Sequence, residues 1–249
     1  MTLHERDLAW EGLLNVRDLG GHRTEDGGET QYGRVVRADS IRRLTDAGWR
    51  ALLDYGVRTI IDLRTDQELE ADPPAELPLE IQHVSLFDED PAVFMKVESV
   101  AEEAPTAAVA TREVYLIFLE SFKHNVAAAL RAVADAPEDG VVVHCMGGKD
   151  RTGLITAFLL HVAGVDTEQI AADYALSEER LRSRHEEWFA AAETEAELER
   201  LRRIAQTPAE AIVGVFEELE RRYGSIEDYL RSGGLSDEDL ARLRTRLRD

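Results

Sequence analysis

The sequence has few cysteines, few lysines and no long apolar run. A single cysteine, Cys145, excludes an intramolecular disulfide and a thiol-disulfide enzyme whose resolving cysteine is in the same chain. No run of about 18 apolar residues is present, as a transmembrane helix would need. The charged segment Met1–Trp10 does not have the pattern of a secretory signal. We therefore expect a cytoplasmic protein without stable membrane association.

Positive charge is scarce, and the formal net charge is −21. Such a balance argues against nucleic acid and anionic membrane surfaces as partners. The 249 residues, 44% of them apolar, suffice for one substantial core, and no internal repeat is present. We expect a single domain over residues 1–249, with an α/β core in 1–164 and a helical part in 165–249. The oligomeric state is not indicated.

The cysteine lies between a predicted strand and a predicted helix. Three valines, Val141–Val143, form a short buried strand, and an apolar helix begins at about Arg151. Gly147 and Gly148 permit backbone conformations with positive φ and close approach to a ligand. A tight strand-to-helix turn directs backbone N–H groups at one point, where the helix N-terminus adds partial positive charge. The loop 144–151 is therefore predicted to bind a phosphate ion.

The side chains of this loop suit nucleophilic attack on phosphorus. A helix N-terminus with nearby cations favours the thiolate form of cysteine, so we expect Cys145 to be the nucleophile. Arg151 offers a planar fork of donors that fits two phosphate oxygens. Thr152 is placed to stabilise the thiolate as it leaves, and His144 to orient the loop. The expected reaction forms and hydrolyses a cysteinyl-phosphate, with no metal or other cofactor.

The pattern His-Cys-x5-Arg-Thr-Gly at 144–153 resembles the signature loop of the cysteine-dependent protein tyrosine phosphatase superfamily. Three upstream segments also match, in order and spacing, a bacterial branch of atypical dual-specificity and lipid-phosphatase-like enzymes, the PtpB-like branch. They are Asn15–Gly21, Gly33–Asp39 and Thr59–Arg64. The resemblance implies a tyrosine-phosphatase-like fold and phosphatase activity.

A phosphatase of this kind needs an acid to protonate the leaving oxygen. The resemblance implies that Asp150, inside the catalytic loop, serves as this acid. Asp88 is the alternative, together with Asp90, because they follow a predicted strand and precede a proline. In so acidic a chain, an ordinary acidic turn is the other interpretation of these two residues. Asp62, or a reaction without a discrete acid, is a further alternative.

Other residues are expected to bind or support the phosphate. Within the loop, Met146, Gly147, Gly148 and Lys149 are candidates, and Lys149 stands out because the chain has only three lysines. The lysine is interpreted as a solvated charge, as a compact cation beside the phosphate, or as a cation that reaches a second phosphate on the substrate. The resemblance implies that a basic residue here suits inositol head groups.

The upstream segments supply three further candidates. Arg17 forms either a salt-bridged turn or one wall of the substrate cleft. Asp62 and Arg64 end a strand and are expected to position the catalytic loop, since ligands lie beyond the carboxyl ends of parallel strands.

Alternating elements predict an α/β fold: a mostly parallel central sheet flanked by helices, with extra C-terminal helices. Strands are expected at 33–38, 57–63, 81–86 and 141–143. Helices are expected from Thr45 to Gly56, over 107–135, and from Arg151 to about Ala163. One of two segments, 91–112 or 178–205, is a candidate for a helical lid, which the resemblance permits.

Three function classes follow from the sequence. The first is a phosphatase, either for phosphotyrosine and phosphoserine/threonine proteins or for phosphoinositides. The second is an inactive phosphate-binding module, disfavoured because Cys145, Arg151 and Thr152 are all present. The third is a scaffold that uses the acidic helical C-terminal part.

Overall fold

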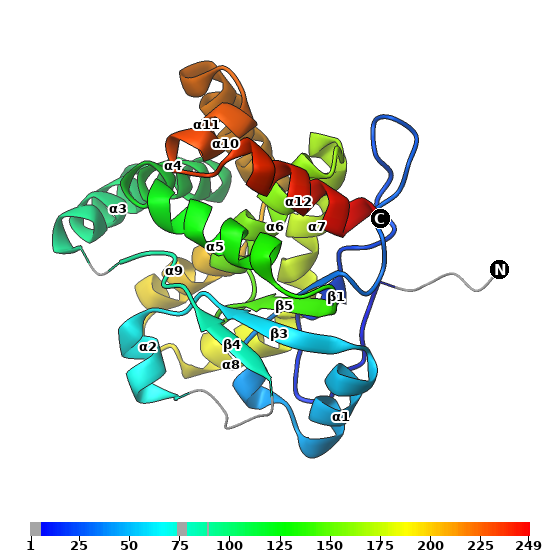
Figure 1. Cartoon of the computed structure of the whole chain (residues 1–249). Coiled ribbons are helices and arrows are strands. Elements are labelled where there is room, and N and C mark those ends of the chain that lie inside the picture. The colour runs from blue at the N-terminus through cyan, green and yellow to red at the C-terminus, as the bar shows by residue number, and fades with distance from the viewer. Residues whose placement is uncertain (1–5, 74–78, 89) are drawn as a thin grey trace.

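The computed structural model describes residues 6–73, 79–88 and 90–249, and its centre is a five-stranded sheet (Figure 1). The strands are ordered β1-β2-β5-β3-β4. The first is antiparallel to its neighbour and the other pairs are parallel, which confirms the predicted mostly parallel sheet. The strands are β1 (Arg17–Asp18), β2 (Val35–Ala38), β3 (Val57–Asp62), β4 (Glu80–His83) and β5 (Gly140–His144).

Helices surround the sheet, and the described chain after residue 164 is helical, as predicted. A short 3-10 helix spans Ile41–Arg43. The α-helices are α1 (Asp46–Asp54), α2 (Asp66–Ala71), α3 (Pro91–Glu103), α4 (Ala107–Ser121), α5 (Lys123–Asp135), α6 (Arg151–Val162), α7 (Thr167–Arg180), α8 (Arg182–Ala191), α9 (Glu195–Ala205), α10 (Ala209–Tyr223), α11 (Ile226–Ser232) and α12 (Asp237–Arg248).

The central strands are apolar on both faces because helices cover both. Successive side chains of a strand point to opposite faces. Ile60 and Val142 accordingly pack in the cluster beneath α1, while Ile61 and Val143 pack in the larger cluster with α5 and α6. This larger cluster also takes in buried residues of α7, α10, α11 and α12, so the C-terminal helices share its core.

The predicted helix over 107–135 is wrong as one element: it is broken at Phe122, where φ is −121° and ψ is 28°. The two halves bury different faces. The first half, α4, packs on α3 and α10, whereas α5 packs on α11, α12 and β3. Phe122 fills the corner against Phe87 and Phe118, with ring centroids 6.1 and 6.2 Å away. A straight helix could not reach both sets of partners.

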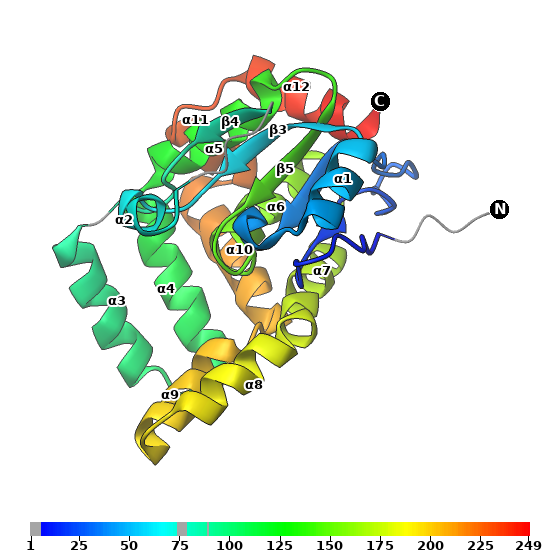
Figure 2. The ribbon, with the colours of Figure 1, turned by 90° about the horizontal axis from the view of Figure 1, so that it is seen from below.

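Two helical hairpins, α3–α4 and α8–α9, extend away from the sheet (Figure 2). Their ends meet where Arg203 of α9 donates to the carbonyls of Ala104 and Thr106, between α3 and α4. The two segments considered as a lid are therefore in contact. No helix in the described parts of the chain is long and apolar enough to cross a membrane.

Candidate active site

The carboxyl ends of three parallel strands gather the residues of the site. His144, the last residue of β5, lies opposite Ala38 of β2 on one side and Asp62 of β3 on the other. Cys145 follows directly and is only 2% exposed. The sheet register thus places the thiol at the edge where ligands of parallel sheets bind.

Five residues, 146–150, connect Cys145 to α6, which begins at Arg151 as predicted. Gly148 has φ +63°, and a Cβ at this position would lie 2.4 Å from the carbonyl oxygen of Ala38. Gly147 was expected to need the same freedom, but its φ is not positive and a Cβ there would meet nothing closer than 3.9 Å. The tight turn therefore depends on the second glycine.

Glu68 of α2 holds the guanidinium of Arg151. Its Oε1 accepts from Nη2 at 2.8 Å, and its Oε2 accepts from Nη1. Burial opposes both charges, but the hydrogen bonds outweigh it: the pKa of Glu68 is lowered and that of Arg151 is raised. The field of Cys145 also contributes to the raised pKa of Arg151, so sulfur and guanidinium are electrostatically coupled. The pair fixes the plane of the guanidinium beside the loop.

Side chains behind the loop bind its carbonyl groups. Asn15 Nδ2 donates to the carbonyls of Gly147 and Gly148 at 3.1 and 3.0 Å, and Arg37 Nη2 donates to that of Gly148 at 2.8 Å. The backbone N–H of Ser40 donates to the Met146 carbonyl at 3.1 Å. Holding these carbonyls on the far side favours amide groups that point into the loop, as anion binding requires.

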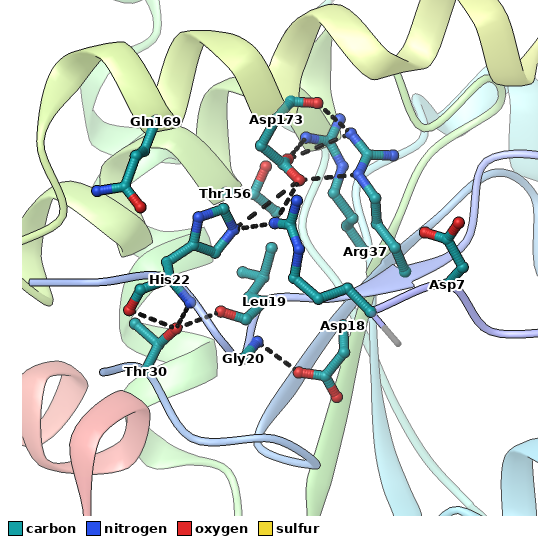
Figure 3. A network of polar contacts seen from close by, with 12 residues as sticks. Asp7, Asp18, Leu19, Gly20, His22, Thr30, Arg37, Thr156, Gln169 and Asp173 are labelled. Atoms are coloured by element: carbon teal, nitrogen blue, oxygen red, sulfur yellow. Dashed lines mark hydrogen bonds and ion pairs between the residues drawn. The ribbon is translucent and has the colours of Figure 1, made fainter. Parts of the chain in front are cut away.

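Asp173 of α7 neutralises the buried arginines behind the loop (Figure 3). It accepts from Arg37 Nη1 at 2.7 Å and from Arg17 Nε at 2.9 Å. The two arginines lower the pKa of Asp173 far below its usual range, although burial opposes this. Arg17 is fully buried and donates also to Asn15 at 2.7 Å. It therefore supports the loop from behind and does not form the cleft wall that was one expectation.

The remaining support comes from His144, Asp62 and Arg64, which the structure brings together. Arg64 donates to both carboxylate oxygens of Asp62, at 2.8 to 3.0 Å. His144 Nε2 is 3.5 Å from Asp62 Oδ2, and its Nδ1 is 3.3 Å from the carbonyl of Cys145. Burial lowers the pKa of His144, so the imidazole is neutral at pH 7. The three residues brace the first residue of the loop.

Lys149 is directed away from the expected position beside a phosphate. Its ammonium donates to the carbonyl of Ile204 in α9 at 2.5 Å and is 3.7 Å from Asp150 Oδ1. The residue is 8% exposed. The only lysine of the loop thus connects it to the α8–α9 hairpin.

A cavity of about 700 Å³ opens beside the loop. Its apolar lining is largely aromatic: Phe87, Phe94, Tyr115 and Phe118, with Val114 and Pro91. Its polar lining includes Thr65, Glu68, Asp150 and Arg151. Among the described residues, the lining does not include Asp88 or Asp90, and Asp90 instead caps α3 by accepting from the N–H of Ala92 at 2.8 Å.

Thr152 is a further residue predicted from the sequence. The hydroxyl of Thr152 is buried and has no hydrogen-bond partner among residues 6–73, 79–88 and 90–249. Within the same ranges, no group of three or more His, Cys, Asp or Glu side chains is placed to hold a metal ion.

The model of the tyrosine phosphatase family matches residues 8–249. The chain belongs to the tyrosine phosphatase family. It is 28% identical over 279 aligned positions to the triple specificity protein phosphatase PtpB of Mycobacterium tuberculosis, covering 98% of each chain. It is also 30% identical over 225 positions to a tyrosine-protein phosphatase of Nostoc commune, covering 85% of this chain and 73% of the relative. The resemblance found in the sequence is confirmed, and the chain is a phosphatase.

The phosphatase site contains residues that the sequence did not reveal. The one sequence signal at Glu68 is the capping box of α2. In this motif the side chains of Thr65 and Glu68 each accept a hydrogen bond from the backbone N–H of the other residue. Asp173 and Tyr115 gave no local signal, because Asp173 contacts Arg37 behind the loop and Tyr115 contacts Asp150, each from a helix distant in sequence. Asn15 lay within a segment that matched the family, but its contact with the loop carbonyls could not be read from it.

Proposed function

We propose that this phosphatase hydrolyses phosphorylated proteins through a cysteinyl-phosphate on Cys145, with phosphotyrosine as the preferred residue. We infer this substrate class from the aromatic cavity beside Arg151 and Asp150. A phenyl ring on the leaving oxygen would lie against Phe87, Phe94 and Phe118 while its phosphate enters the loop. The names of both relatives, a tyrosine-protein phosphatase and a triple specificity protein phosphatase, support this choice.

The proposed reaction has two steps. The Cys145 thiolate attacks phosphorus, the bond from phosphorus to the leaving oxygen breaks, and Asp150 gives its proton to that oxygen. Water then attacks the phosphorus, passing a proton to the Asp150 carboxylate. Inorganic phosphate leaves and the thiolate is restored. Arg151 and the loop amides stabilise the equatorial oxygens in both steps.

Asp150 is favoured over Asp88 as the acid by position. Asp150 and Arg151 line the same cavity, whereas Asp88 is exposed and outside that lining among the described residues. A general acid has to come within hydrogen-bond reach of the leaving oxygen.

A phosphoinositide phosphatase is the second candidate, and the placement of Lys149 weakens it. Its ammonium is bound to the Ile204 carbonyl and lies near Asp150, so it is not presented to a second phosphate. The net charge of −21 also disfavours an anionic bilayer.

The test compares wild type, Cys145→Ser, Asp150→Asn and Asp88→Asn on a phosphotyrosine peptide and on phosphoinositide vesicles. We expect higher kcat/KM on the peptide, no turnover by Cys145→Ser, and a loss of about 100-fold or more in Asp150→Asn with disappearance of the basic limb of the pH profile. Faster hydrolysis of the vesicles would overturn the substrate class. Loss of the basic limb in Asp88→Asn instead would overturn the acid.

A further inference from the structure

Asp150 occupies the N-cap of α6 but does not cap it. At eight other helices the N-cap side chain accepts from a backbone N–H of its own first turn, as at α1, α2, α3, α4, α7, α9, α11 and α12. Aspartate is among the residues that do this best. At α6 no side-chain cap is formed, and the backbone of Asp150 is helical, with φ −84° and ψ −74°. Another interaction therefore holds this carboxylate.

That interaction comes from two buried tyrosines. The hydroxyl of Tyr115 on α4 donates to Asp150 Oδ1 at 2.6 Å, and it lies 2.8 Å from the hydroxyl of Tyr174 on α7. Both residues are at most 3% exposed, and their rings meet edge to face at 6.2 Å. Since Tyr115 gives its one proton to Asp150, its oxygen accepts from Tyr174. The direction of the chain is thus Tyr174 to Tyr115 to Asp150.

Both phenols remain donors at any pH at which the protein works. Burial raises the pKa of Tyr115 well above its usual value, and burial likewise raises that of Tyr174, with Asp150 as a further cause in each case. Oδ1 is also 3.7 Å from the Lys149 ammonium. With donors gathered around Oδ1, a proton on the carboxyl group belongs on Oδ2.

We propose that Tyr115, supported by Tyr174, is the positioning residue of the general acid. It holds Oδ1 so that Oδ2 carries the exchangeable proton toward the cavity that Tyr115, Asp150 and Arg151 line together. Tyr115 transfers no proton itself. This inference rests on the proposed role of Asp150 as the acid.

The groups around the carboxylate define what a pH experiment will report. The charged and titratable side chains that interact with it are Lys149, Arg151, Tyr115, Tyr174 and His185. Burial lowers the pKa of His185, with Lys149 as a further cause. A hydrogen bond donated to a carboxylate stabilises its charged form, and Tyr115→Phe removes one such bond.

The test is Tyr115→Phe, which removes one hydroxyl and keeps the ring. We expect kcat on phenyl phosphate, a poor leaving group, to fall about tenfold or more. On 4-nitrophenyl phosphate, whose leaving group needs little protonation, the fall should be much smaller. KM should stay unchanged and the basic limb of the profile should move to higher pH. Tyr174→Phe should change these quantities in the same direction by less.

Tyr229→Phe is the matched control. This phenol is as buried, and it donates to the Leu119 carbonyl on the same helix α4 at 2.9 Å, outside the cavity lining. It should leave the leaving-group dependence and the pH profile unchanged, whatever its effect on the unfolding temperature. Equal losses on both aryl phosphates in Tyr115→Phe, with an unmoved basic limb, would overturn the proposal.

A second measurement separates this proposal from the function on which it rests. Adding Tyr115→Phe to Asp150→Asn should cause no further loss, because the acid is already absent. If Tyr115→Phe lowered kcat in the Asp150→Asn background by the same factor as in the wild-type background, the positioning role would be overturned and the acid assignment would remain intact. Turnover by Cys145→Ser would instead overturn the proposed function.

Discussion

A single carboxylate, Glu68, orients the guanidinium of Arg151, the residue that we propose binds the phosphate. The two terminal nitrogens of the guanidinium face Glu68, and the Nη1 group also lies 3.4 Å from the Leu63 carbonyl. Among the described residues no acceptor is within hydrogen-bond distance of Arg151 Nε, so we expect this edge of the guanidinium to meet the phosphate. The sequence made Arg151 a candidate, but its partner is 83 residues away and belongs to a helix of only six residues. Such a contact is set by the packing of the whole sheet edge.

We expect Glu68→Gln to lower kcat/KM about tenfold or more, since hydrogen bonds between charged groups contribute about 1.5–3 kcal/mol. An amide donates as well as accepts, so it cannot satisfy both guanidinium nitrogens. Steady-state kinetics on an aryl phosphate measures the effect. Glu70→Gln, at an exposed position of the same helix, is the control and should match wild type. Equal kinetics for the two variants would show that Arg151 holds its position without Glu68.

At the scale of elements, long apolar runs were predicted well and short or bent elements were not. The strands β3 and β5 begin and end within about two residues of the predicted positions, because buried parallel strands are continuous apolar runs. The predicted strand over 81–86 is shorter, since β4 ends at His83. The two-residue strand β1 is too short to give a pattern.

In the loop 144–151, too, local features were predictable and long-range contacts were not. Its own residues were predictable because strand, glycine turn and helix are consecutive in the sequence. Its supports were not, because Asn15 and Arg37 contact it only through the sheet register, and Asp173 reaches Arg37 only through the packing of α7.

The two loop glycines provide a matched pair of variants. Gly148→Ala combines a positive φ with a Cβ that would lie 2.4 Å from the Ala38 carbonyl at the end of β2. We expect it to lose phosphate binding and at least about 1 kcal/mol of unfolding free energy. Gly147→Ala, with its nearest neighbours at 3.9 and 4.0 Å, should keep kcat/KM within a few-fold. Phosphate inhibition constants and urea unfolding of the two variants measure these effects. Equal values for Gly148→Ala and Gly147→Ala would contradict the assigned turn.

At the scale of the whole molecule, buried charge makes stability depend on pH. His22 is 5% exposed, and burial, with the charge of Arg6 beside it, lowers its pKa to about 4. Its Nε2 faces Arg6 Nη1, which is a donor, so the imidazole is neutral in the folded state. The unfolded chain takes up this proton at its ordinary pKa near 6.5.

The unfolded state therefore binds more protons than the folded state between about pH 4 and 6.5, so stability falls as the pH decreases through this window. From pH 7 to 5 the loss through His22 is about 2 kcal/mol. Urea unfolding at the two pH values measures it. His22→Gln should reduce the difference by that amount, whereas His124→Gln, at an exposed position of α5, should not. If the difference in unfolding free energy between pH 7 and pH 5 were unchanged in His22→Gln, other groups, such as His144, would be its cause.

The most direct test of the central claim is to acid-quench the wild-type enzyme during turnover of 4-nitrophenyl phosphate and map the phosphoryl group by peptide mass spectrometry. The account predicts one phosphoryl group, on Cys145, that accumulates more in Asp150→Asn when hydrolysis of the intermediate becomes limiting. Cys145→Ser should show neither turnover nor label. Steady turnover with no phosphoryl group on Cys145, or with the group on another residue, would contradict the account.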